Sequence, residues 1–150
     1  MPQSFVSLNC HVIFNTKDRE PLITDTVQSR LYEYIGGTAR NTGSKLLAIG
    51  GMFDHLHLLL SLGKQTCVAD SVRDIKANSS RWIHETFEGL HGFAWQSGYG
   101  AFSVSCSNAD EVKRYIAEQP QHHRVRTFKE EFIAFLTRHN IEYDERYIWD

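Results

Sequence analysis

Apolar and polar residues alternate along the first part of the chain. Within residues 4–14, one face of an extended chain carries Val6, Leu8, Cys10, Val12 and Phe14, and the other carries Ser7, Asn9 and His11. A period of two residues is typical of a strand that is buried on one side. The pattern therefore predicts a first strand near the N-terminus.

Further along, the apolar residues recur every three or four positions. Residues 24–41 and 68–87 both show this spacing, which predicts two amphipathic helices. Residues 108–119 predict a third helix, and Pro120 should end or kink it because proline disfavours helical geometry in the residue before it.

Three more segments predict strands. Residues 45–49 and 55–62 flank a turn with Gly50 and Gly51, which suits an antiparallel hairpin, and residues 93–105 predict one strand or two short ones. The resulting order, β-α-β-β-α-β followed by helical material, predicts an α+β fold of the ferredoxin-like or RRM-like split β-α-β kind. We expect two helices on one face of an antiparallel sheet and an additional tyrosine-bearing helix near the C-terminus.

Composition is consistent with a single globular domain spanning residues 1–150. The chain is 41% hydrophobic and 23% charged, which allows a substantial core and argues against disorder. No apolar stretch approaches the length of a membrane span, and the N-terminus lacks the pattern of a signal peptide. We therefore expect a cytoplasmic protein. The three cysteines form no CxxC pattern, so neither a disulfide framework nor a thiolate zinc site is indicated.

The net charge of −2 argues against binding of nucleic acid by bulk electrostatic attraction. The charge is unevenly distributed, however. Residues 130–150 carry six acidic and two basic side chains, whereas residues 64–129 carry nine basic and seven acidic ones. A protein that contacts nucleic acid through a few placed groups is therefore compatible with the sequence.

The strongest chemical signal is the pair His55 and His57 on one predicted strand. Alternation places both imidazoles on the same face, where two nitrogens could bind one divalent cation, and Asp54 could orient a ring. A chance pair of histidines is the alternative. A histidine-triad hydrolase is disfavoured because Leu59 occupies the place of its third histidine.

A second signal is Tyr115 on the third predicted helix, with Gln119 one turn later on the same face. A tyrosine at this spacing could belong to the core. Combined with a cation on the two histidines, its hydroxyl could instead attack an aligned phosphate, with the Gln119 amide oxygen as a third ligand. Either Mg²⁺ or Mn²⁺ is plausible, and Mn²⁺ suits imidazole ligands better.

These residues together resemble the HUH-class single-tyrosine transposases of small bacterial insertion sequences, which include the REP-associated tyrosine transposases. The HUH motif corresponds to His55-Leu56-His57, the tyrosine to Tyr115 and the metal-binding glutamine to Gln119. The resemblance covers nearly the whole chain, through the segments GMFDHLHLLLSL, IKANSSRW, AWQSGYGAFSVS, VKRYIAEQPQHH and FLTRHNIEYDERYIW.

The resemblance implies cleavage and rejoining of single-stranded DNA through a 5′-phosphotyrosine, with recognition of DNA hairpins near the ends of the element. It also implies a divalent metal, Mg²⁺ or Mn²⁺, on His55, His57 and Gln119. Family members are homodimers in which the tyrosine helix of one subunit completes the histidine site of the other. The first strand, with an edge free to pair with its symmetry mate, would suit such a dimer.

Candidate DNA contacts lie on two predicted helices and on one segment between them. Three side chains on the segment, those of Trp95, Gln96 and Tyr99, could stack on or hydrogen-bond to exposed bases, although Trp95 could equally belong to the core. Two other functions remain open: an inactive or domesticated hairpin-binding protein, and a small phosphoesterase that uses water in place of Tyr115. The candidate contacts on the helices are Arg73, Lys76, Ser79, Ser80, Arg81, Lys113 and Arg114.

Overall fold

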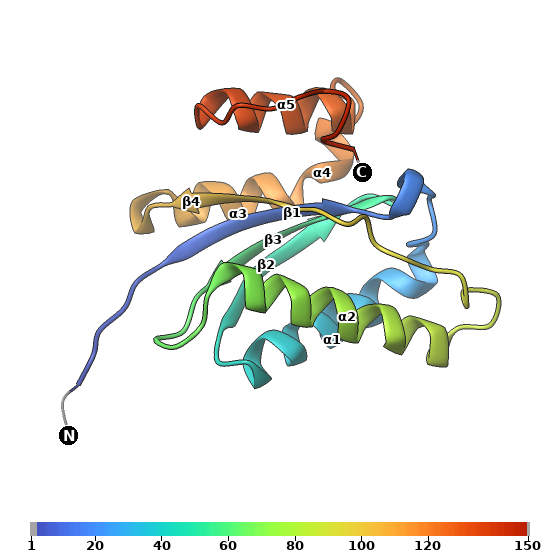
Figure 1. Ribbon diagram of the computed structural model, residues 1–150, viewed down its shortest axis with the longest axis horizontal. Coiled ribbons are helices and arrows are strands. Elements are labelled where there is room, and N and C mark those ends of the chain that lie inside the picture. Colours follow the sequence, from blue (N-terminus) through green and yellow to red (C-terminus); the bar gives the residue numbers. More distant parts are fainter. Residues whose placement is uncertain (1–2, 150) are drawn as a thin grey trace.

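The computed structural model describes residues 3–149 and contains one antiparallel four-stranded sheet (Figure 1). The strands lie side by side in the order β2-β3-β1-β4, which is the order of a ferredoxin-like sheet. The predicted fold class is therefore confirmed. The strands are β1 (Asn9–Asn15), β2 (Lys45–Gly51), β3 (His55–Ser61) and β4 (Gly100–Val104).

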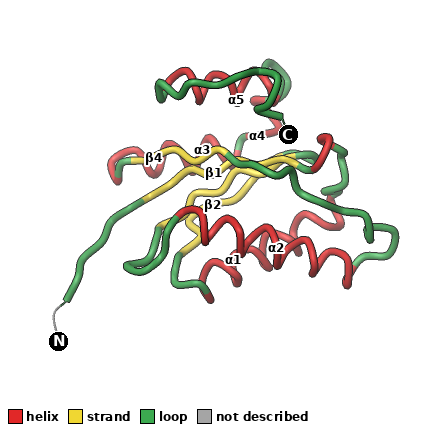
Figure 2. The backbone as a smooth tube through the Cα atoms, in the orientation of Figure 1, coloured by secondary structure: helices red, strands yellow, loops and turns green. Residues whose placement is uncertain are grey.

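Helices lie on both faces of this sheet (Figure 2). Two long helices pack against one face and enclose the main hydrophobic core, while three shorter helices lie over the other face. None of the helices within residues 3–149 is long and apolar enough to cross a membrane. The long helices are α1 (Asp25–Asn41) and α2 (Val68–Thr86), and the shorter ones are α3 (Ala109–Ala117), α4 (Gln119–His122) and α5 (Phe128–Arg138).

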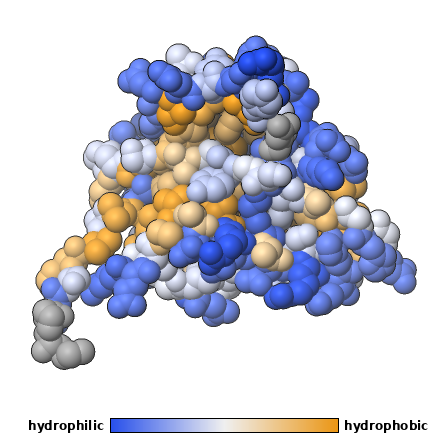
Figure 3. Space-filling view, in the orientation of Figure 1, coloured by the Kyte–Doolittle hydropathy of each residue, from blue (hydrophilic) through white to orange (hydrophobic). Residues whose placement is uncertain are grey.

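Strand β1 follows the predicted alternation. Cys10, Val12 and Phe14 face the main core, whereas His11 and Ile13 face the side of α5. The strand begins at Asn9 rather than at residue 4. The segment before it runs away from the sheet and carries apolar side chains in the open (Figure 3). The most exposed of them are Phe5, Val6 and Leu8.

The position of β1 corrects one expectation. This strand pairs with β3 on one side and with β4 on the other, so neither of its edges is free. Its backbone donors and acceptors are already used within the sheet, and a second subunit could not add a strand there. The outer strands of the sheet are β2 and β4.

Proline 120 breaks the helical segment as predicted. Helix α3 ends at Ala117, and Glu118 leaves helical geometry with φ −98° and ψ 20°. A new short helix, α4, then begins at Gln119, with Pro120 in its first turn, where a missing N–H costs nothing. The break turns the chain so that Gln119 points inward and is fully buried.

A second, smaller core fixes α5 over the sheet. Phe128, Phe132 and Leu136 of α5 pack against Ile13 and Phe102, which project from β1 and β4. Thr127 caps the helix in a capping box with Glu130. This packing places the first turn of α5 above the histidines of β3.

Candidate active site

The site is built on β3, whose side chains alternate between the two cores. Leu56, Leu58 and Leu60 enter the main core. His55 and His57 point to the opposite face, where both are almost completely buried and their ring centroids lie 5.3 Å apart. The predicted side-by-side arrangement of the two imidazoles is confirmed.

His55 is oriented by the residue before it. Its Nδ1 atom lies 2.8 Å from Asp54 Oδ1. Partial burial opposes ionisation of Asp54, but the hydrogen bond from His55 holds the pKa of this carboxyl below its usual value. An ionised carboxylate only accepts, so His55 Nδ1 donates and a neutral His55 ring leaves Nε2 as a lone pair. The structure thus shows the contact through which Asp54 could orient His55.

His57 lies between two partners that it contacts with its two ring nitrogens. Its Nδ1 atom is 2.8 Å from His11 Nε2, and its Nε2 atom is 2.9 Å from Glu131 Oε1. Burial lowers the pKa of His57 to about 4, although Glu131 acts in the opposite direction. Near pH 7 the His57 ring is therefore neutral and carries one proton. Either Glu131 accepts a hydrogen bond from Nε2, or His11 accepts one from Nδ1 when the Nε2 atom of His11 is unprotonated.

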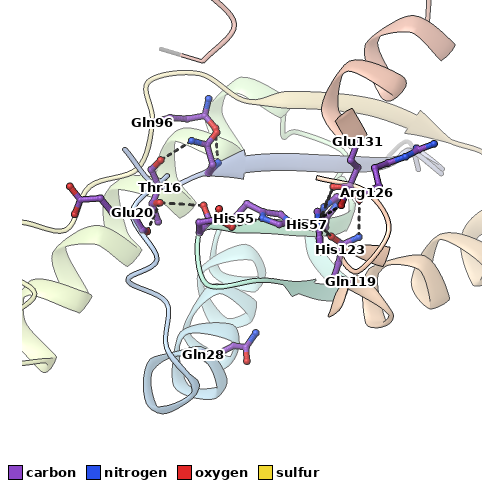
Figure 4. A network of polar contacts seen from close by, with 12 residues as sticks. Thr16, Glu20, Gln28, His55, His57, Gln96, Gln119, His123, Arg126 and Glu131 are labelled. Atoms are coloured by element: carbon purple, nitrogen blue, oxygen red, sulfur yellow. Dashed lines mark hydrogen bonds and ion pairs between the residues drawn. The ribbon is translucent and has the colours of Figure 1, made fainter. Parts of the chain in front are cut away.

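Gln119, the first residue of α4, and His123, directly after α4, approach His55 (Figure 4). Gln119 Oε1 lies 3.2 Å from His55 Nε2 and 2.9 Å from His123 Nε2, and the two imidazole nitrogens lie 3.0 Å apart. The Nδ1 atom of His123 is 2.9 Å from the carbonyl oxygen of Arg126, which can only accept, so Nδ1 carries the proton.

Three hydrogen-bond acceptors consequently face one another. In neutral rings, the Nε2 atoms of His55 and His123 are lone pairs, and they meet the amide oxygen of Gln119. Acceptors at this distance repel unless a proton or a cation lies between them. Burial lowers the pKa of His123, which disfavours the proton.

The donor set fits a divalent cation. One ligand atom from each of four residues lies within 4.8 Å of all the others, and the set combines neutral imidazoles with a carboxylate. The four residues are His55, His57, His123 and Glu131.

Tyr115 projects from α3 beside this cluster. Its ring centroid lies 5.9 Å from that of His57, its ring stacks on His122, and its hydroxyl donates to Glu131 Oε2. Burial, reinforced by Glu131, raises the pKa of the phenol, so Tyr115 is protonated near pH 7. One chain therefore brings a tyrosine hydroxyl and the histidine cluster together.

A cavity of about 300 Å³ opens beside Tyr115 between α3 and α5. Two arginines on its wall give it positive charge, with one carboxylate opposite. The lining residues are His11, Asn108, Glu111, Val112, Tyr115, Arg126, Ala134, Phe135 and Arg138.

Three residues of the site were not among the predicted site residues. For His122 and His123 the sequence leaves two interpretations open, a surface pair, which is the default, or a place near the active site, and it marks His11 only as a polar position on a predicted strand. Glu131 had a signal that could have been used, because it lies on the apolar face of α5 between Phe128 and Phe132. An acidic residue on the buried face of a helix is rare unless it is paired.

The predicted DNA contacts on α2 lie across the sheet from Tyr115. Ser79 and Trp95 are buried and hydrogen-bonded to each other, with Nε1 of the indole 3.0 Å from the hydroxyl oxygen. Gln96 is buried as well, and its main-chain carbonyl oxygen accepts from Lys76 Nζ at 2.6 Å. The Ser79–Trp95 and Lys76–Gln96 hydrogen bonds tie α2 to the segment before β4, which favours the core role for Trp95 and leaves its ring unavailable for base stacking.

The remaining candidate contacts are more accessible. Arg73 is exposed and paired with acidic neighbours on its own helix, and Arg81 is exposed with Asn78 as its partner. Ser80 is partly buried against the carbonyl of Phe93. Lys113 and Arg114 lie on α3, the helix that carries Tyr115. Contact of these residues with DNA stays a prediction.

Known proteins are similar to this chain over most of its length. A family model described as IS200-like transposase matches residues 4–119. The ISDra2 transposase TnpA of Deinococcus radiodurans is 27% identical over 117 residues, which are 75% of this chain and 84% of that protein.

Two solved structures are similar in fold. A crystal structure of a candidate transposase from Deinococcus radiodurans R1 has a TM-score of 0.63 and 29% identity, and the match covers 79% of this chain and 96% of that one. The structure of a REP-associated tyrosine transposase bound to a REP hairpin has a TM-score of 0.62 and 17% identity, over 82% of this chain and 73% of that one. At 17% identity, the similarity to the second structure shows a shared fold.

Proposed function

Because this chain belongs to the family of IS200-like transposases, we propose that it cleaves and rejoins single-stranded DNA at the ends of an insertion sequence, with Tyr115 as the nucleophile. The observation that carries the proposal is the position of the Tyr115 hydroxyl beside the buried cluster of His55 and His57. A protein that only binds DNA has no need of a tyrosine and a cation site in one place.

The reaction is a transesterification. Attack by the Tyr115 oxygen forms a bond to phosphorus and breaks the bond to the 3′ oxygen, and the phenol proton ends on that oxygen. The products are a 5′-phosphotyrosine and a free 3′-hydroxyl. One phosphoester replaces another, so the reverse attack rejoins strands without an external energy source.

A divalent cation, Mg²⁺ or Mn²⁺, would be held by His55, His57 and Gln119. When bound, it would neutralise charge on the scissile phosphate and align it for attack. Asp54 and His11 orient the two imidazoles, so the ligand nitrogens are preorganised by the fold.

The proposed substrate is single-stranded DNA with a hairpin near the cleavage site. Support comes from the REP-associated relative, which is described as bound to a REP hairpin. The cavity beside Tyr115 has Arg126 and Arg138 on its wall, which suits an anionic strand. The resemblance implied a tyrosine supplied by a second subunit. The proximity of Tyr115 to His57 of the same chain instead supports a site completed within one subunit.

The proposal is tested with a single-stranded hairpin oligonucleotide from the flanks of the gene, incubated with the protein and Mn²⁺ or Mg²⁺. We expect a covalent protein–DNA band on a denaturing gel that is lost in Tyr115→Phe. Tyr147→Phe, which changes an exposed tyrosine elsewhere, is the matched control and should leave the band unchanged. Cleavage that persists in Tyr115→Phe would instead point to water as the nucleophile and would refute the proposal.

A further inference from the structure

Glu131 is a carboxylate buried inside the protein. It lies in the first turn of α5, is 1% exposed, and forms no ion pair with a lysine or arginine among residues 3–149. Burial of an unpaired charge is costly, so such a group is neutralised or lies beside a compensating charge.

The groups around this carboxylate show what could compensate its charge. One oxygen of Glu131 and one nitrogen each of His55, His57 and His123 all lie within 4.8 Å of one another, an arrangement that suits a divalent cation. Within residues 3–149, no lysine or arginine is paired with Glu131 in place of such a cation.

The two carboxylate oxygens face different groups. Oε1 lies 2.9 Å from His57 Nε2 and 3.7 Å from His123 Nε2, on the side of the imidazole cluster. Oε2 accepts a hydrogen bond from the Tyr115 hydroxyl and a longer one, at 3.3 Å, from Gln119 Nε2. The hydrogen bond to Gln119 also turns the amide oxygen of that residue toward the histidines.

We propose that Glu131 is an anionic ligand of the divalent cation through Oε1 and positions the Tyr115 phenol beside that cation through Oε2. The proposal rests on the proposed function and deepens it. A carboxylate supplies the hard oxygen donor that Mg²⁺ and Mn²⁺ favour, and its charge offsets part of the charge of the ion. One side chain thereby joins the cation to the nucleophile.

The position of Glu131 along the chain is the second part of the inference. The family model matches residues 4–119, whereas Glu131 lies twelve residues beyond that region. Here α5 is fixed over β3 by the packing of Phe128 and Phe132. The segment beyond the matched region would thus be part of the active site rather than an appendage.

The test is titration of the purified full-length protein with MnCl₂ by isothermal titration calorimetry. Glu131→Gln keeps the size of the side chain and one oxygen acceptor but removes the negative charge. We expect the affinity for Mn²⁺ to fall at least about tenfold. Glu130→Gln removes the same charge one residue earlier, at an exposed position where glutamine preserves the capping box, and should bind Mn²⁺ like the unaltered protein. Equal affinity in Glu131→Gln and Glu130→Gln would overturn the ligand role.

The positioning role has its own readout. At saturating Mn²⁺ the cation site is filled, so loss of a residue that only binds the ion should no longer slow adduct formation. Loss of a residue that also positions Tyr115 should still slow it. We therefore expect the rate of covalent adduct formation by Glu131→Gln to stay depressed at saturating Mn²⁺, and its full recovery would overturn the positioning role. Glu131→Asp restores the charge on a shorter side chain, so it should recover more of the Mn²⁺ affinity than of the rate of adduct formation. The same variant tests the proposal if Glu131→Gln does not fold.

Failure of this inference can be distinguished from failure of the proposed function. If the unaltered protein forms the adduct and Glu131→Gln binds Mn²⁺ equally well, the inference fails and the function stands. If Mn²⁺ affinity falls in Glu131→Gln but the unaltered protein forms no adduct with DNA, the ligand role stands and the function fails.

Discussion

His11 is the side-chain partner of Nδ1 of the His57 ring. The two imidazoles are joined by a hydrogen bond of 2.8 Å, and both are almost fully buried. For His57 to present the Nε2 lone pair to a cation, its proton must lie on Nδ1, where only His11 can accept it. His11 thus does for His57 what Asp54 does for His55.

Replacement of this acceptor should weaken metal binding without removing a ligand. In His11→Phe we expect Mn²⁺ affinity to fall about 10- to 100-fold, the range typical of residues that orient metal ligands. Calorimetric titration measures the change, and His91→Phe, at an exposed loop position, is the control. Unchanged affinity in His11→Phe would show that the tautomer of His57 is set in another way.

Buried neutral histidines also make the stability of the metal-free protein depend on pH. Burial lowers the pKa of His11 to about 3 and that of His57 to about 4. Unfolded histidines take up protons below about pH 6.5, but these two do not while the protein is folded, so stability is lost as the pH falls from about 6.5 to 4. We expect the free energy of unfolding to decrease by about 3 kcal/mol or more over this interval.

Urea unfolding in the presence of a chelator, at several pH values, measures this loss. His11→Phe removes one of the two groups and should flatten the pH dependence. A free energy of unfolding that stays constant between pH 6.5 and 4 would contradict the account.

Individual site residues were predictable from the sequence to different degrees. His55 and His57 could be placed together because a strand has a fixed period of two. Glu131 could not be placed with them, because the path of the chain after Pro120 depends on how α5 packs. Trp95 was ambiguous for a similar reason, since whether an aromatic side chain faces solvent depends on the packing of a segment without regular structure.

Among the elements, the contact between β2 and α3 is the one that places Tyr115. A Cβ atom at Gly50 of β2 would collide with the carbonyl oxygen of Ile116, the residue after Tyr115. Only glycine allows the helix backbone to approach the strand so closely.

Gly50→Ala should therefore displace α3. We expect a loss of about 1–3 kcal/mol in the free energy of unfolding, which is typical of overpacking, and a further loss of adduct formation because the phenol moves. Gly92→Ala is the matched control, because a Cβ atom there meets nothing within 4 Å. Thermal unfolding and the covalent-adduct assay give the two readings, and a Gly50→Ala protein that matches Gly92→Ala in both would refute the role of this contact.

The elements themselves followed largely from local patterns. The order of strands and long helices and the break at Pro120 were all predicted from periodicity and proline chemistry. The strand expected over residues 93–105 is shorter, Gly100–Val104, because Phe93 and Trp95 leave the sheet to fill the main core. The central place of β1 depends on pairing between distant segments, and no local pattern reports such pairing.

At the scale of the whole molecule, one chain brings Tyr115 and the proposed cation ligands together. Tyr115 reaches His57 within one subunit, so a subunit that lacks either group should not be rescued by a partner that lacks the other. We expect a mixture of Tyr115→Phe and His57→Ala proteins to form no covalent adduct. The mixture is tested in the hairpin assay after unfolding and joint refolding, with each variant alone as the control. Recovery of about a quarter or more of the activity would show that subunits exchange the tyrosine helix.

The three tryptophans stand in three separate layers of this small protein. Trp82 stacks on Tyr34 in the helical layer, Trp95 lies in the main core, and Trp149 packs against Phe132 of α5. A protein carrying Trp82→Phe and Trp95→Phe therefore keeps a single intrinsic fluorophore on the α5 layer. Its emission would follow movement of α5 over the site while the sheet stays folded, so entry of DNA or of a cation could be timed optically without an added label.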